Sequence, residues 1–124
     1  MANIVGIMLF VQVILGGSAV LLNLDIGYHV AWGIATFVVL VATTVFVVRS
    51  YGSKSTIFKV SIAAIVDFVV QGILGLFSFS SDTFVVVHLT NAFVLAVIVT
   101  YMISFVDSAD KNTDVRTTVQ PAPV

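Results

Sequence analysis

Four apolar runs, each long enough to cross a lipid bilayer, constrain the fold of this chain more than any other feature. They extend over about 4–22, 26–48, 58–79 and 83–106. An α-helix needs about 20 apolar residues to cross about 30 Å of hydrocarbon. Because lipid offers no hydrogen-bond partners, each run must satisfy its own backbone groups, and a helix does so. The sequence therefore predicts an all-α fold, an integral membrane four-helix bundle.

The composition supports lipid as the solvent and excludes several classes of function. Of the 124 residues, 60% are hydrophobic and 9% are charged, and the mean hydropathy is +1.19. The net charge of −1 and the lack of a basic cluster argue against a nucleic-acid partner, because phosphate binding needs concentrated Lys and Arg. The absence of Cys excludes disulfides, thiolate metal sites and iron–sulfur clusters.

The chain divides into one membrane domain and a polar tail. The domain is expected over 1–106, and its first run is interpreted as a retained helix because no Lys or Arg precedes it, as a signal peptide would require. After residue 106 the composition changes to Asp, Lys, Asn, Thr and Pro. Residues 107–124 are therefore expected to form a disordered cytoplasmic tail.

The basic residues predict the orientation in the membrane. Arg49, Lys54 and Lys59 lie in or beside the middle loop, and Lys111 and Arg116 lie in the tail, whereas the other two connections carry no basic residue. The positive-inside rule then places both termini and the middle loop in the cytoplasm of a multi-pass cell-membrane protein. The other connections are only a few residues long, so helices one and two, and three and four, are expected to be antiparallel neighbours.

The chain matches itself when its second half is laid over its first. Residues 12–16, Gln-Val-Ile-Leu-Gly, align without gaps with residues 71–75, Gln-Gly-Ile-Leu-Gly. The repeats extend over about 4–48 and 58–106. Two hairpins of equal topology imply a pseudo-two-fold axis along the membrane normal.

The same offset aligns His29 with His88, and these are the two histidines of the chain. Each is expected about one turn inside the outward end of its helix. Two neutral imidazoles that face each other across the axis suit the axial positions of one heme iron, b-type or related. A zinc or copper site would need further ligands, and the outer half offers only Asp25 and Asp82. The alternative is that each histidine is an interfacial residue hydrogen-bonded to a neighbour.

The repeated motif supplies the rest of the expected cofactor pocket. Gln12 and Gly16 share one face of the first helix, and Gln71 and Gly75 share one face of the third. Glycine at these positions lets a porphyrin plane, or simply another helix backbone, come close. Trp32 shares a face with the first histidine, where it walls the ring or anchors the helix at the interface.

Asp67 is a carboxylate about two turns into the third helix, with Gln71 one turn above it on the same face. Acids within the membrane are costly, usually face the bundle interior and mark proton or ion paths. Asp67 is therefore a candidate proton site. The opposing account is that water, Lys59 or Arg49 satisfies the carboxylate.

A Gln-x-x-Leu-Gly motif near mid-helix, a short outer turn and a His opening the next helix resemble the heme A synthase family of cytochrome oxidase assembly proteins. The resemblance covers about 4–106 and corresponds to one four-helix half of a typical member. It implies that His29 and His88 are the axial pair. It also implies an enzyme that oxidises a methyl group of heme O to a formyl group.

The sequence departs from that family in ways that leave the activity open. The first histidine commonly lies in a Glu-His-Arg stretch, whereas residues 28–30 here are Tyr-His-Val, and the outer-loop cysteine pair is missing. No catalytic residue is assigned. The expected function is a heme-binding protein of the respiratory chain, either heme A synthase-like or a small b-type cytochrome that transfers electrons. A non-catalytic accessory subunit of a respiratory or oxidase complex is the alternative, and a homodimer is compatible with both.

Overall fold

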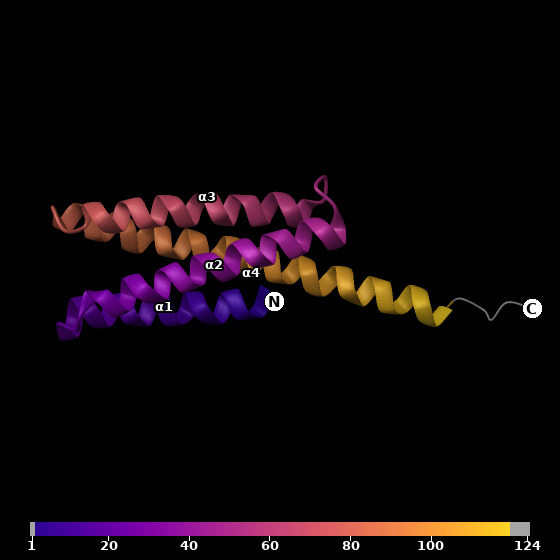
Figure 1. Cartoon of the computed structure of the whole chain (residues 1–124), viewed down its shortest axis with the longest axis horizontal. Coiled ribbons are helices and arrows are strands. Elements are labelled where there is room, and N and C mark those ends of the chain that lie inside the picture. The colour runs from indigo at the N-terminus through magenta and orange to yellow at the C-terminus, as the bar shows by residue number, and fades with distance from the viewer. Residues whose placement is uncertain (1, 120–124) are drawn as a thin grey trace, which may run out of the picture.

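The computed structural model describes residues 2–119, with side chains up to Ala109, and these residues form four α-helices and no strand. The helices are α1 (Ala2–Leu22), α2 (Ile26–Tyr51), α3 (Thr56–Phe77) and α4 (Asp82–Val119). Each is long and apolar enough to cross a membrane. The predicted all-α membrane bundle is confirmed (Figure 1).

Polar residues at the connections begin and end the helices where the apolar runs predict. The Asp25 carboxylate accepts a hydrogen bond of 2.8 Å from the backbone N–H of Gly27 and so caps the N-terminus of α2. Ser55 caps α3 in a similar way. At the end of α2, Gly52 has a φ of +81°, a left-handed conformation that favours glycine. Its N–H bonds to the carbonyl of Val48 and closes the helix.

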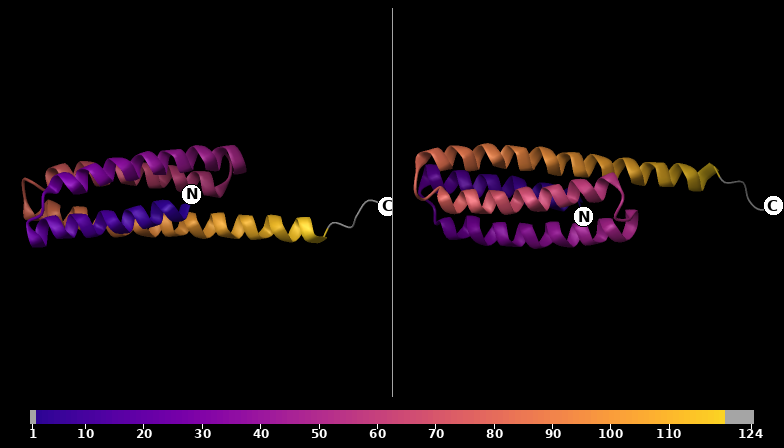
Figure 2. Two further views of the ribbon diagram at one scale, coloured as in Figure 1. Left: turned by 60° about the horizontal axis from the view of Figure 1, so that its bottom comes forward. Right: turned by 90° about the horizontal axis from the view of Figure 1, so that it is seen from above.

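The helices form a ring in which each contacts two neighbours. Among the described residues, the contacts join α1 to α2, α2 to α3, α3 to α4 and α4 back to α1. Therefore α1 lies diagonally opposite α3, and α2 opposite α4, as the views in Figures 1 and 2 show. The connections 23–25 and 78–81 lie together at one end of the bundle, called the turn end. The connection 52–55 lies at the other end with the start of α1, and this is called the loop end.

The apolar core lies in the half of the bundle nearer the loop end. Its central side chains are almost inaccessible, with Leu40 and Met102 at 0% exposure. All four helices contribute to the cluster of buried residues: Ala2, Val5, Leu9, Leu40, Ala64, Leu95, Val99 and Met102. The outer surface is apolar as well, since Ile7 and Leu76 are 65% and 73% exposed. A soluble bundle has the same kind of core but many polar and charged side chains on its surface, so this apolar surface is suited to lipid.

The last helix is longer than the sequence predicts. It continues past residue 106 to Val119 and projects beyond the other helices at the loop end (Figure 1), so residues 107–119 are helical where a disordered tail is expected. The segment has no Gly or Pro before Pro121, so it lacks the two residues that interrupt a helix most strongly. The end of the expected tail, 120–124, lies outside the described residues.

Candidate functional site

The two histidines meet at the centre of the bundle near the turn end. His29 lies in the first turn of α2 and His88 in the second turn of α4, on the two diagonally opposite helices. Their ring centroids are 6.2 Å apart and their planes are inclined by 76°. The predicted approach of the two imidazoles from opposite sides is confirmed.

In the first hairpin, the imidazole of His29 is held by both the backbone and the side chain of Gln12. Its Nδ1 lies 3.0 Å from the Gln12 carbonyl oxygen, and the Gln12 Nε2 donates to the His29 carbonyl at 3.0 Å. The same Gln12 Nε2 lies 3.2 Å from His29 Nε2. A carbonyl only accepts, so Nδ1 carries the proton and donates, and Nε2 presents its lone pair.

In the second hairpin, Gln71 holds His88 with the same set of contacts. His88 Nδ1 donates to the Gln71 carbonyl at 3.0 Å, and Gln71 Nε2 donates to the His88 carbonyl at 2.9 Å. Gln71 Nε2 lies 3.4 Å from His88 Nε2. The repeat found in the sequence is therefore a repeat of hydrogen bonds, and both imidazoles are fixed as the same neutral tautomer.

The repeated glycines make room for the two rings. A Cβ placed on Gly16 would come within 2.8 Å of His29 Cε1, and one on Gly75 within 3.1 Å of His88 Cε1. Both distances are shorter than ordinary carbon contacts of about 3.5–4.0 Å. The glycines therefore let each imidazole lie directly against the neighbouring helix, and the porphyrin contact stays a prediction.

Trp32 takes a role that the sequence did not predict. Its Nε1 donates to the backbone carbonyl of Met8 at 2.9 Å, so the half-buried indole ties α2 to α1 one turn below the histidine. This hydrogen bond satisfies the indole N–H without a cofactor. Every residue type carries a backbone carbonyl, so the identity of residue 8 could not reveal that it accepts a hydrogen bond from Trp32.

Asn91, expected only to share a helix face with His88, lies where Trp32 lies in the first repeat. Asn91 Nδ2 donates to Gln71 Oε1 at 2.9 Å, so the amide that holds His88 is itself held. By contrast, Gln12 Oε1 is buried and has no partner among the described residues. The two halves of the site thus share their glutamine, glycine and histidine contacts. They differ at the next residues outward, Trp32 in the first hairpin and Asn91 in the second.

Asp67 faces this polar region from α3. Its carboxylate atom Oδ2 is buried without a partner in the described part of the chain. Lys59 lies two turns away along α3, about 12 Å by helical rise. Asp67 as a whole is only partly buried, and its role as a proton site stays a prediction.

The donor set of the site is two imidazoles. Within residues 2–109, no group of three or more His, Asp, Glu or Cys side chains comes together. Zinc sites need three or four protein ligands, whereas an iron in a porphyrin takes four nitrogens from the macrocycle and needs only two axial ligands. The site offers two imidazoles, each with an Nε2 lone pair that now faces a glutamine amide.

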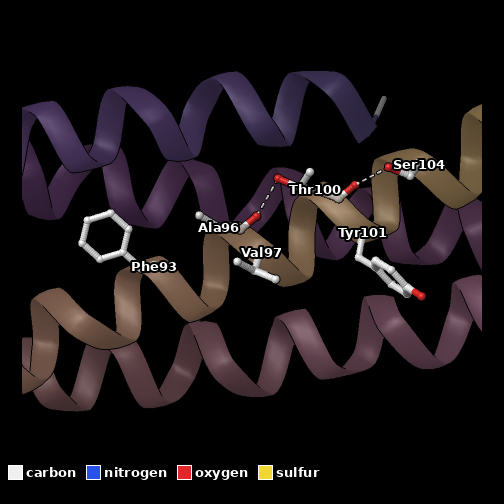
Figure 3. Close-up of a pocket in the computed structure, with 6 residues that line it drawn as sticks. All are labelled: Phe93, Ala96, Val97, Thr100, Tyr101 and Ser104. Atoms are coloured by element: carbon white, nitrogen blue, oxygen red, sulfur yellow. Dashed lines mark hydrogen bonds between the residues drawn. The ribbon is translucent and has the colours of Figure 1, made fainter.

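A second surface feature lies away from the histidines, on the lipid-facing side of α4. It is a shallow groove of about 320 Å³ shown in Figure 3 and lined by Phe93, Ala96, Val97, Thr100, Tyr101 and Ser104. Thr100 Oγ1 donates to the Ala96 carbonyl and Ser104 Oγ to the Thr100 carbonyl, so these hydroxyls are satisfied within their own helix. The groove therefore presents an apolar surface to lipid.

Family models, curated proteins and solved structures gave no match to this chain.

Proposed function

We propose that this protein binds one heme, b-type or related, between His29 and His88 near the turn end of the bundle. The observation that carries the proposal is the 6.2 Å separation of the ring centroids across the bundle axis. Two metal–nitrogen bonds of about 2 Å, with half an imidazole ring at each end, span about 6 Å. The centroid separation of 6.2 Å is close to this span and supports the proposal.

The hydrogen bonds at Nδ1 support the same proposal. Histidines that ligate metals usually donate their other ring N–H to a carbonyl or carboxylate, which fixes the ring and leaves Nε2 free to bind. Both histidines donate from Nδ1 to a backbone carbonyl. For ligation, the amide N–H groups of Gln12 and Gln71 near the two Nε2 atoms must turn away, and the glutamines then lie beside the macrocycle.

Ligation by two histidines favours electron transfer over catalysis. A bound heme supplies a one-electron couple, and an iron with two protein ligands keeps no coordination position for oxygen or substrate. The proposal is therefore a small b-type cytochrome of a respiratory membrane. Heme A synthase-like activity would require one histidine to leave the iron, and the missing Glu and Cys residues of that family do not favour it.

The proposal includes an orientation. Arg49, Lys54 and Lys59 lie at or near the loop end, and the turn end has no basic residue. The positive-inside rule then places both termini and the loop end in the cytoplasm of the cell membrane. The histidine pair lies near the outer face, where the positive N-terminal ends of α2 and α4 offset the charge of the heme propionates.

Optical spectroscopy of the purified full chain after heme-replete expression tests the proposal. We expect a Soret band and, on reduction, split α and β bands of a low-spin heme. His29→Gly and His88→Gly should each lose the low-spin spectrum, and added imidazole should restore it because it fills the vacated axial position. Thr90→Ala, an exposed position on α4, serves as the matched control and should keep the wild-type spectrum.

A folded protein without a Soret band would overturn the proposal. In that case, co-purification with larger respiratory subunits would favour the accessory-subunit alternative, in which the histidines only join the helices.

A further inference from the structure

Asp67 is the one acidic residue within the four apolar runs, and it lies one helical turn from the histidine site. It precedes Gln71 by four residues on α3, so the two side chains share a face of the helix. Gln71 Nε2 in turn lies 3.4 Å from His88 Nε2. The membrane-embedded carboxylate is therefore close enough to the imidazole pair for a change of charge at either place to affect the other.

One oxygen of the Asp67 carboxylate is buried without a hydrogen-bond partner. This atom is Oδ2, and the described part of the chain offers it no donor. A buried charge without a partner is costly, and a carboxylate in such a place gives up its charge by binding a proton. Asp67 therefore has a physical reason to bind a proton when its surroundings lose positive charge.

The titratable groups on the two helices that pack against α3 belong mainly to the histidine site. These helices are α2 and α4. Within residues 26–48 and 83–106, their titratable side chains are His29, His88 and Tyr101. Tyr101 is 59% exposed and lines the lipid-facing groove. The histidine site is therefore the place beside Asp67 where a charge can change.

Charged groups elsewhere are distant from Asp67 or absent. Lys59 lies about 12 Å away along α3 by helical rise, and the fully buried Ala64 lies between the two residues. Arg49 is in the last turn of α2, at the loop end. The α1 helix contains no titratable side chain, and its position that matches Asp67 is Met8. The first hairpin thus has no counterpart of this carboxylate.

The distance from Asp67 to the imidazole pair follows from contacts that the helices fix. Four residues of helical rise, about 6 Å, separate Asp67 from Gln71. The Gln71 amide then lies 3.4 Å from His88 Nε2. At the resulting separation of about 10 Å and an effective dielectric constant of about 20, the loss of one positive charge strengthens proton binding to a carboxylate about tenfold.

We propose that Asp67 binds a proton when the heme held by His29 and His88 is reduced, so that the carboxyl group compensates the change of charge at the site. This inference rests on the proposed function. An external one-electron donor supplies the electron, which stays at the iron, and bulk water supplies the proton, which forms the O–H bond of the carboxyl group. No other bond forms or breaks. Because the coupling is reciprocal, protonated Asp67 favours the reduced heme by the same factor.

The test is an equilibrium redox titration of the heme-loaded full chain in lipid nanodiscs, followed by optical absorption and repeated from acid to alkaline pH. Asp67 is neutral in both redox states at the acid limit and ionised in both at the alkaline limit, where its negative charge favours the oxidised iron. The midpoint potential should therefore fall with rising pH by about 60 mV in total, since a tenfold change corresponds to about 59 mV for one electron. Asp67→Asn stays neutral at every pH and should lose this fall while keeping the low-spin spectrum.

Infrared difference spectra between the reduced and the oxidised protein provide a second readout. A band of a protonated carboxyl group should appear on reduction of the wild type and should be absent from Asp67→Asn. Asp82→Asn is the matched control, because it removes an exposed carboxylate at the turn end and should keep both the band and the pH dependence. Asp67→Asn combined with Met8→Asp moves the acid to the matched position of the first hairpin and should regain the pH dependence.

The outcomes separate this inference from the proposed function. A low-spin heme spectrum with the same pH dependence in the wild type and in Asp67→Asn would overturn the inference alone, as would a wild-type potential that does not change with pH. A double variant that binds heme but does not regain the pH dependence would also overturn it, because the effect would then not depend on charge at this distance. A folded chain without a Soret band would overturn the proposed function and the inference with it.

Discussion

Substitution of Gly16 by Ala tests whether the imidazole of His29 depends on close contact with α1. The new Cβ would lie 2.8 Å from His29 Cε1 and 3.0 Å from Nδ1. The His29 ring would have to move by about 0.7 Å to reach an ordinary carbon–carbon contact of about 3.5 Å. The same displacement away from α1 would stretch the 3.0 Å bond between His29 Nδ1 and the Gln12 carbonyl to about 3.7 Å, beyond the hydrogen-bond limit.

The expected loss of stability follows from these contacts. A lost hydrogen bond costs about 1 kcal/mol and overpacking about 1–3 kcal/mol, whereas replacing Gly by Ala within a helix contributes about 0.5–1 kcal/mol in favour of folding. We expect Gly16→Ala to lower the free energy of unfolding by about 1–3 kcal/mol. Gly75→Ala should have a smaller effect, because its Cβ would lie 3.1 Å from His88 Cε1.

Unfolding by sodium dodecyl sulfate in mixed micelles provides the measurement. The fluorescence of Trp32 reports it, since this is the one tryptophan of the chain and it joins α1 to α2. Gly17→Ala is the matched control, because a Cβ there meets nothing within 4 Å. If Gly16→Ala proved as stable as Gly17→Ala, the close contact between His29 and α1 would be refuted.

Two further predictions concern the core and the orientation. Leu40→Ala removes a fully buried side chain and should cost about 2–5 kcal/mol in the same unfolding assay, whereas Leu76→Ala, at a position 73% exposed to lipid, should change it by less than about 0.5 kcal/mol. Equal effects would mean that the core does not lie where the structure places it. Because the chain has no Cys, single cysteines at exposed Ser53 and Ser80 can be labelled on intact cells with an impermeant maleimide. The proposed orientation requires labelling of Ser80→Cys and protection of Ser53→Cys, and the reverse pattern would overturn it.

The sequence was sufficient to predict the helices and the residues that the site contains. Apolar runs of bilayer length determine the spans, because lipid leaves the backbone no other way to satisfy its hydrogen bonds. The register match between the two repeats assigned His29, Gln12 and Gly16, and likewise His88, Gln71 and Gly75, to one expected pocket. It did not predict that each glutamine holds the histidine of its own hairpin by hydrogen bonds.

The outer contacts of the site could not be predicted in this way. Asn91 and Trp32 occupy matched positions but have different polar groups, and the partner of the indole is a backbone carbonyl that every residue type carries. The fourth helix shows another limit, because 107–119 has the composition of a solvated tail yet contains no residue that breaks a helix. The composition of residues 107–119 predicts contact with water, but it does not determine whether their backbone is helical.

The two hairpins differ in the hydrogen-bond partners of two matched residues, Trp32 and Asn91. Trp32 donates to the backbone of residue 8, so the side chain there is released from any polar requirement, and Met is tolerated. Asn91 instead donates to the side chain of Gln71, and the position that matches residue 8 carries Asp67. The outer contacts therefore differ between the hairpins because the indole of Trp32 bonds to a backbone carbonyl, whereas the amide of Asn91 bonds to a side chain.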